Sequence, residues 1–129
     1  MPVDEPQGPE NQNSNESAPQ DLLSEISVSE TKALMDSGAP MILVDCRELR
    51  EQSIAEIEGS VLIPMDEIPG RISELEEFRG ERIVIHCHHG GRSLQVVNWL
   101  RNHGFETAQN MTGGIEMWSQ EIDSDVARY

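Results

Sequence analysis

The sequence has few basic residues, few aromatic residues and few cysteines. Its 129 residues include nine Lys and Arg against 24 Asp and Glu, and Lys32 is the single lysine. A formal net charge of −15 opposes binding to nucleic acid or to an anionic membrane, so we expect neither as a partner. The sequence also shows no signal-peptide pattern and no apolar run of about 18–20 residues, which a membrane span needs.

The two cysteines, Cys46 and Cys87, are too few and too unlike in their surroundings to form a disulfide framework. We therefore expect reduced thiols and a cytoplasmic protein. Cys46 is open to two interpretations: a small buried core residue, or a resolving thiol for Cys87.

Residues 1–20 differ in composition from the rest of the chain. They contain four Pro and four acidic residues but no Lys or Arg. Such a segment cannot bury enough apolar surface to offset its loss of conformational entropy, which predicts a disordered tail over residues 1–20. Residues 21–129 are long enough to form one domain with a single core.

Strand and helix patterns alternate along residues 21–129, which predicts an α/β fold with a parallel sheet. The predicted strands are Ile26–Val28, Met41–Asp45, Val61–Ile63, Ile83–Ile85 and Thr107–Met111. The predicted helices are Glu30–Ser37 with Ser29 as its N-cap, Glu48–Gln52, Ile68–Phe78, Leu94–His103, and one after Gly113-Gly114.

The segment Cys87-His-His-Gly-Gly-Arg-Ser93 lies between a predicted strand and a predicted helix. Unpaired N–H groups at a helix start carry partial positive charge, and they lower the pKa of a nearby thiol. Cys87 is therefore the predicted nucleophile, placed at the carboxyl end of a strand, where open α/β sheets bind ligands. The residues predicted to bind substrate are His88, His89, Gly90, Gly91, Arg92 and Ser93.

Each loop residue has a physical role in this prediction. Gly90 and Gly91 can adopt positive φ and turn successive N–H groups inward. Arg92 supplies a fixed charge at the rim, or a link to the carbonyl oxygens of the loop. His88 and His89 supply further hydrogen-bond donors.

Two other patterns suggest structural roles. Asp45 and Arg47 are expected to form an ion pair that supports the loops beside the site. The run from His86 to His89 suggests a metal site, but side chains of consecutive residues project in different directions and no second Cys/His pair follows at finger-like spacing. We therefore predict no metal and no cofactor.

Over residues 24–129 the chain resembles a single-domain rhodanese of the thiosulfate sulfurtransferase family. The motifs that carry the resemblance are Asp45-Cys-Arg-Glu48, Ile57-Glu-Gly-Ser60 with Ile63-Pro-Met65, the loop Cys87–Ser93, and Gly113-Gly-Ile-Glu-Met-Trp118. The resemblance implies a rhodanese-like fold with a five-stranded parallel sheet flanked by helices on both faces. It also implies that Cys87 takes up sulfane sulfur as a persulfide, held by loop amides and Arg92.

The implied activity transfers sulfur from a donor such as thiosulfate to cyanide or a thiol acceptor. The sequence departs from the family pattern at Gln52 and Glu56, where an aromatic residue and a histidine are common, so we expect altered packing there. The expected donor is a small sulfur-containing anion or a persulfide. The acidic body steers a dianion such as thiosulfate weakly, so we expect its turnover to be slow.

Three alternatives remain beside this activity. The chain could relay persulfide to a protein partner that accepts sulfur, or it could be a non-catalytic docking domain.

The third alternative is a phosphatase. Phosphatases of similar fold have five residues between Cys and Arg, whereas four separate Cys87 from Arg92. The shorter loop suits a single sulfur atom better than a tetrahedral oxyanion, which argues against phosphatase activity.

Overall fold

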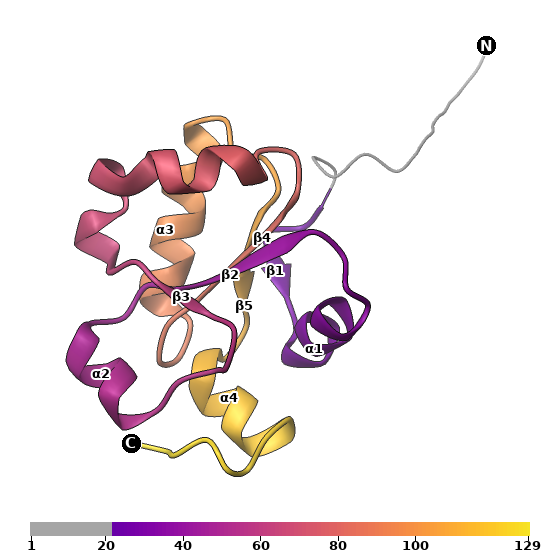
Figure 1. The fold of residues 1–129 in the computed structure, drawn as a ribbon, viewed down its shortest axis with the longest axis vertical. Helices are drawn as coiled ribbons and strands as arrows, with labels where there is room; N and C mark the ends of the chain where they lie inside the picture. The colour runs from indigo at the N-terminus through magenta and orange to yellow at the C-terminus, as the bar shows by residue number, and fades with distance from the viewer. Residues whose placement is uncertain (1–21) are drawn as a thin grey trace.

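Five parallel strands form one sheet in the order β1–β5–β4–β2–β3 (Figure 1). The computed structural model describes residues 22–129, so the predicted tail of residues 1–20 lies outside the described part. The strands are β1 (Glu25–Ile26), β2 (Met41–Asp45), β3 (Val61–Leu62), β4 (Arg82–His86) and β5 (Ala108–Met111). The predicted five-stranded parallel sheet is confirmed.

Helices cover both faces of this sheet, as predicted (Figure 1). The helices are α1 (Val28–Asp36), α2 (Leu49–Ile54), α3 (Gly91–Asn102) and α4 (Gly114–Glu121), with 3₁₀ segments η2 (Met65–Glu67) and η3 (Pro69–Phe78). One face of the sheet packs against α3, η2 and η3, and the other face packs against α1 and α4.

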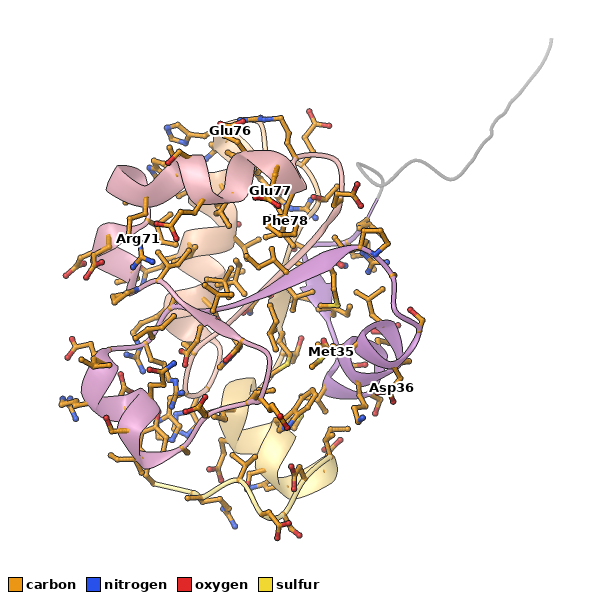
Figure 2. All side chains as sticks on the ribbon, viewed as in Figure 1. Met35, Asp36, Arg71, Glu76, Glu77 and Phe78 are labelled. Carbon is orange, nitrogen blue, oxygen red and sulfur yellow. The ribbon has the colours of Figure 1, made fainter. Side chains whose placement is uncertain are left out.

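The central strands have apolar side chains on both faces because helices cover both faces. In β4, Ile83 and Ile85 join the core on the α3 side, whereas Val84 joins the core on the α4 side. The covering helix α1 has an inner and an outer side. Figure 2 shows Met35 on the side of α1 that faces the sheet and Asp36 on the outer side. This two-sided burial fixes β4 in the middle of the sheet, with Cys87 directly after its last residue.

The predicted N-cap of the first helix was wrong. The helix begins two residues earlier, and Ser27 rather than Ser29 caps it. The Ser27 hydroxyl accepts a hydrogen bond from the Glu30 amide at 3.0 Å, and the Glu30 carboxylate accepts one from the Ser27 amide at 3.0 Å. Only Ser27 has a glutamate three residues later to complete this reciprocal pair, and it shortens the preceding strand to Glu25–Ile26.

The segment predicted as one helix over Ile68–Phe78 is a 3₁₀ segment instead. Pro69 stands at its start, as expected for a residue that lacks an N–H group. Arg71 leaves the helical region at φ −117°, which produces a kink. The apolar spacing still places Leu75 in the core on the α3 side, where Phe78 also packs (Figure 2).

Candidate active site

The Cys87 sulfur lies in a cradle of hydrogen-bond donors at the carboxyl end of β4. The Gly90 amide donates to Sγ at 3.1 Å and the Ser93 amide donates to it at 3.4 Å. The Ser93 hydroxyl oxygen lies 3.2 Å from the same sulfur. Cys87 is only 1% exposed, so the cradle encloses its sulfur almost completely.

Two adjacent glycines shape the turn into α3 in different ways. Gly90 is the N-cap of the helix and has a φ of +111°, which aims its amide at the sulfur. Gly91 is the first helical residue and has no positive φ, so the prediction of positive φ for Gly91 was wrong. The reason is that the helix begins at Gly91, three residues before the predicted start at Leu94.

The other side of the loop is attached to the start of α4. The amides of Ile115 and Glu116 donate to the carbonyl oxygens of Cys87 and His88 at 2.9 and 3.1 Å. Gly114 lies so close that a Cβ atom there would be 2.4 Å from the His88 oxygen. The Gly113-Gly114 pair is therefore a packing requirement of the active loop, a role that the sequence analysis did not assign.

Ser93 connects the sulfur to a second hydrogen-bonding group, Asn110 of β5. The Ser93 hydroxyl donates to the Asn110 side-chain oxygen. The Asn110 amide nitrogen donates to the Gly90 carbonyl and to the Glu25 carboxylate, each at 3.2 Å, which fixes the orientation of the amide. A hydroxyl has one hydrogen, so Ser93 can donate either to Asn110 or to a Cys87 thiolate.

These contacts hold the pKa of Cys87 far below its usual value, at about 4. The largest cause is a hydrogen bond from the adjacent Cys46 thiol, followed by those from the Ser93 hydroxyl and the Ser93 and Gly90 amides, while burial acts in the opposite direction. The same proximity, together with burial, raises the pKa of Cys46. Cys87 is therefore a thiolate at neutral pH, and Cys46 is its protonated neighbour.

Arg92 does not bind the loop carbonyls, which was one of its two predicted roles. Its guanidinium forms a two-point ion pair with Glu51 of α2, at 2.7 and 2.9 Å. This partner lowers the pKa of Glu51 to about 2, so the carboxylate stays charged at neutral pH. The charge that Arg92 brings to the rim is therefore largely neutralised.

Tyr129 joins this ion pair to the rest of the site. Its hydroxyl donates to Glu51 at 3.0 Å and accepts from Arg47 at 2.8 Å. Its ring stacks on His88, with the ring centroids 3.8 Å apart. Neither Tyr129 nor Glu51 was predicted from the sequence. No local pattern indicates a contact between Tyr129 and the distant residues Glu51 and His88.

The predicted Asp45–Arg47 ion pair is confirmed. An Arg47 nitrogen lies 2.6 Å from the Asp45 carboxylate, and both side chains are fully buried. Arg47 also donates to the carbonyl oxygens of Glu51 within α2 and of Ala55, its C-cap. Asp45 and Arg47 thus hold α2 beside the active loop without contacting the sulfur.

His88 and His89 lie at the rim with their rings stacked at a centroid distance of 3.9 Å. With Glu116 they place three potential ligand atoms within 4.8 Å of one another. Stacked imidazoles, however, direct their lone pairs side by side rather than toward one point, and Glu116 is already paired with Arg128 at 2.6 Å. We assign no metal to this cluster.

His86, the remaining histidine beside the loop, is fully buried at the end of β4. Burial lowers its pKa, so it is neutral, and its Nδ1 atom lies 3.5 Å from the Cys87 carbonyl oxygen. It packs within the strand and does not face the cradle.

No helix among residues 22–129 has the length and apolar character to cross a bilayer.

Fold and cradle together define an α/β protein with a buried, activated cysteine at a strand end. The family model described as "Rhodanese-like domain" matches residues 27–121. The chain therefore belongs to the rhodanese-like sulfurtransferase family.

Named relatives agree with this assignment. The maize "Adenylyltransferase and sulfurtransferase MOCS3-2" is 34% identical over 109 residues, which cover 81% of this chain and 23% of the relative. The "Putative sulfur carrier protein YrkF" of Bacillus subtilis is 33% identical over 77% of this chain and 52% of its own length. The chain thus spans about a quarter of one relative and about half of the other.

A solved structure matches over nearly its full length. The human single-domain sulfurtransferase TSTD1 superposes with a TM-score of 0.66 and 26% identity, covering 77% of this chain and 97% of that one. The match covers most of the chain, so the rhodanese-like fold predicted from the sequence is confirmed.

Proposed function

We propose that the protein transfers sulfane sulfur through a persulfide on Cys87. The thiolate attacks the outer sulfur of a donor; with thiosulfate, the bond to the sulfonate sulfur breaks and sulfite leaves with its electron pair. An acceptor thiolate or cyanide then attacks the outer sulfur of the persulfide and releases the Cys87 thiolate. The observation that carries this proposal is the Cys87 sulfur held by two amides and a hydroxyl.

The residues of the loop take distinct parts in this scheme. Gly90 and Ser93 stabilise the negative sulfur through their amides, and His88 and His89 line the rim through which donor and acceptor pass. Gly91 starts the helix whose N-terminal field favours an anion. The scheme needs no cofactor and no metal. We propose the cytoplasm as its compartment, because thiol acceptors are abundant there.

The ion pair of Arg92 favours donors of low charge. Glu51 occupies the guanidinium with two hydrogen bonds, and Arg47, which shares Tyr129 with this pair, is buried and paired with Asp45. Thiosulfate carries two negative charges and meets no free cation among these residues. We therefore propose a persulfide, on a small thiol or on a partner protein, as the preferred donor, with thiosulfate as a slow substitute.

This preference supports a second candidate function, a relay that passes sulfur between proteins. One relative is named a sulfur carrier and another a sulfurtransferase, and both are longer than this chain. Fast loading from a protein persulfide combined with slow turnover of thiosulfate would favour the relay. A docking domain without chemistry would not need the activated thiolate.

Mass spectrometry tests the proposed chemistry directly. The reduced protein is mixed with thiosulfate or with glutathione persulfide and quenched in acid at short times. We expect a gain of one sulfur atom, which cyanide removes as thiocyanate and which the Cys87→Ser variant lacks. No gain with either donor would refute the proposed function and favour a docking role.

A further inference from the structure

Cys46 and Cys87 occupy equivalent positions on neighbouring strands. In the parallel pair β2–β4, Asp45 is opposite His86, and a cysteine follows each of them. The Cys46 amide donates to the His86 carbonyl at 3.0 Å, which continues the ladder past the last paired residues. The two cysteines are therefore next in register at the carboxyl edge of the sheet.

The two side chains also lie on the same side of the sheet. Both belong to the core on the α3 side, and each residue is 1% exposed. Neighbouring strands are about 4.7–4.9 Å apart, and disulfides join residues whose Cα atoms are about 4.4–6.8 Å apart. Both cysteines are free, and the spacing of neighbouring strands falls within the Cα range that a disulfide spans.

From this juxtaposition we infer that Cys46 resolves the Cys87 persulfide when no acceptor arrives, releasing sulfide and leaving a Cys46–Cys87 disulfide. The inference rests on the proposed function, which supplies the persulfide. The Cys46 sulfur attacks the Cys87 Sγ atom, and the bond from Sγ to the outer sulfur breaks. The outer sulfur leaves with the electron pair and takes up the Cys46 proton, so the transferred sulfur is reduced to sulfide while the two cysteines are oxidised.

The environment of Cys46 keeps its thiol protonated, which makes the attack on the persulfide slow. Two thiolates in contact oppose each other, so Cys46 stays protonated while Cys87 is an anion. Loading moves the negative charge to the outer sulfur, one bond further from Cys46, and turns Sγ into an electrophilic disulfide-type sulfur. A protonated thiol attacks slowly, which leaves time for an external acceptor to take the sulfur first.

A peroxide reaches the same disulfide without a sulfur donor. The Cys87 thiolate takes an oxygen atom from hydrogen peroxide and becomes a sulfenic acid, with release of hydroxide. The Cys46 thiol then attacks Sγ, the S–O bond breaks, and water leaves. This second route depends on the placement of the two cysteines and not on the proposed function.

The experiment follows loaded protein in the absence of an acceptor. The full chain is reduced, loaded with thiosulfate or glutathione persulfide, freed of small molecules and sampled over time for mass and for released sulfide. We expect one sulfide per loaded chain, while the mass falls from one added sulfur to two hydrogens below the reduced protein. The Cys46→Ser variant should keep its added sulfur and release no sulfide.

Peptide mapping locates the bond in the unmutated protein, which avoids dependence on the folding of a variant. After the remaining thiols are alkylated, trypsin produces peptides 33–47 and 83–92, each with one cysteine. We expect these two peptides to be joined after sulfide release and also after treatment with peroxide. A Cys46→Val variant supplies a second comparison if the serine variant unfolds.

The possible failures separate the two proposals. A wild-type persulfide that lasts as long as that of Cys46→Ser, with peroxide giving only oxygenated Cys87, overturns the resolving role and leaves the sulfurtransferase proposal standing. Absence of any loading refutes the proposed function and with it the sulfide-releasing step. In that case the peroxide-treated sample still reports whether the two cysteines can form the disulfide.

Discussion

The Ser93→Ala substitution tests how the cradle keeps Cys87 ionised. It removes a side-chain hydroxyl in contact with the sulfur and leaves the amides of Gly90 and residue 93 in place. A hydrogen bond to a charged group contributes about 1.5–3 kcal/mol, which corresponds to about 1–2 pKa units. Asn110 competes for the same hydrogen, so we expect the lower end, a rise of about 1 unit.

The sign of the pH dependence follows from the depressed pKa. Cys87 is a thiolate above its pKa of about 4, so its alkylation is fast at neutral pH and slows as the pH falls through that value. In Ser93→Ala the thiolate is less stable, and the midpoint moves to higher pH. The opposite shift is expected for Asn110→Ala, because the Ser93 hydrogen is then free to bind the thiolate.

The assay measures the alkylation rate with iodoacetamide between pH 3 and 9 and subtracts the rate of the Cys87→Ser variant. Ser119→Ala is the matched control, since Ser119 is also buried but donates to the Val126 carbonyl at 2.6 Å. Circular dichroism at each pH confirms that the variants remain folded. An unchanged midpoint in Ser93→Ala, or shifts of the same sign in both cradle variants, would contradict the account of a shared hydrogen.

Three further predictions concern the charges and the backbone around the loop. Glu51→Gln frees the cation at the rim and should raise kcat/KM for thiosulfate, in steady-state assays, more than Glu48→Gln, which removes the same charge from a residue without that contact. Gly114→Ala should abolish persulfide loading in mass spectra because its Cβ meets loop backbone, whereas Gly91→Ala has open space and should load normally. Asp45→Asn leaves a buried guanidinium without its counterion and should lower the free energy of unfolding in urea by about 3–5 kcal/mol.

The sequence predicted most of the fold because its strongest patterns are local. The apolar runs at Met41–Asp45 and Ile83–Ile85 can be buried on two faces only in a central parallel sheet, and the structure has both in its middle. The errors are local choices between similar alternatives. Ser27 and Ser29 both suit an N-cap, and only the glutamate three residues after Ser27 decides between them.

The loop of the candidate site was also predictable, whereas its surroundings were not. A strand end, a cysteine, two glycines and a helix start are contiguous in the sequence, so Cys87 was found without the structure. Glu51 and Tyr129 reach the loop only through the tertiary fold. Glu51 contacts Arg92 across 41 residues of sequence, and the Tyr129 ring stacks on His88.

The cradle stabilises its anion mainly with neutral donors. This explains both the low pKa of Cys87 in an acidic chain and the preference for a single negative sulfur atom. Amides, a hydroxyl and the Cys46 thiol lower the pKa of Cys87 within a chain of net charge −15, while Glu51 neutralises the nearby cation. Such donors act at hydrogen-bond range, so they favour a single negative sulfur atom over a distant dianion. The donor that contributes most, Cys46, is itself a thiol next to the reacting sulfur. The group that activates Cys87 is therefore also placed to attack the persulfide of the proposed reaction.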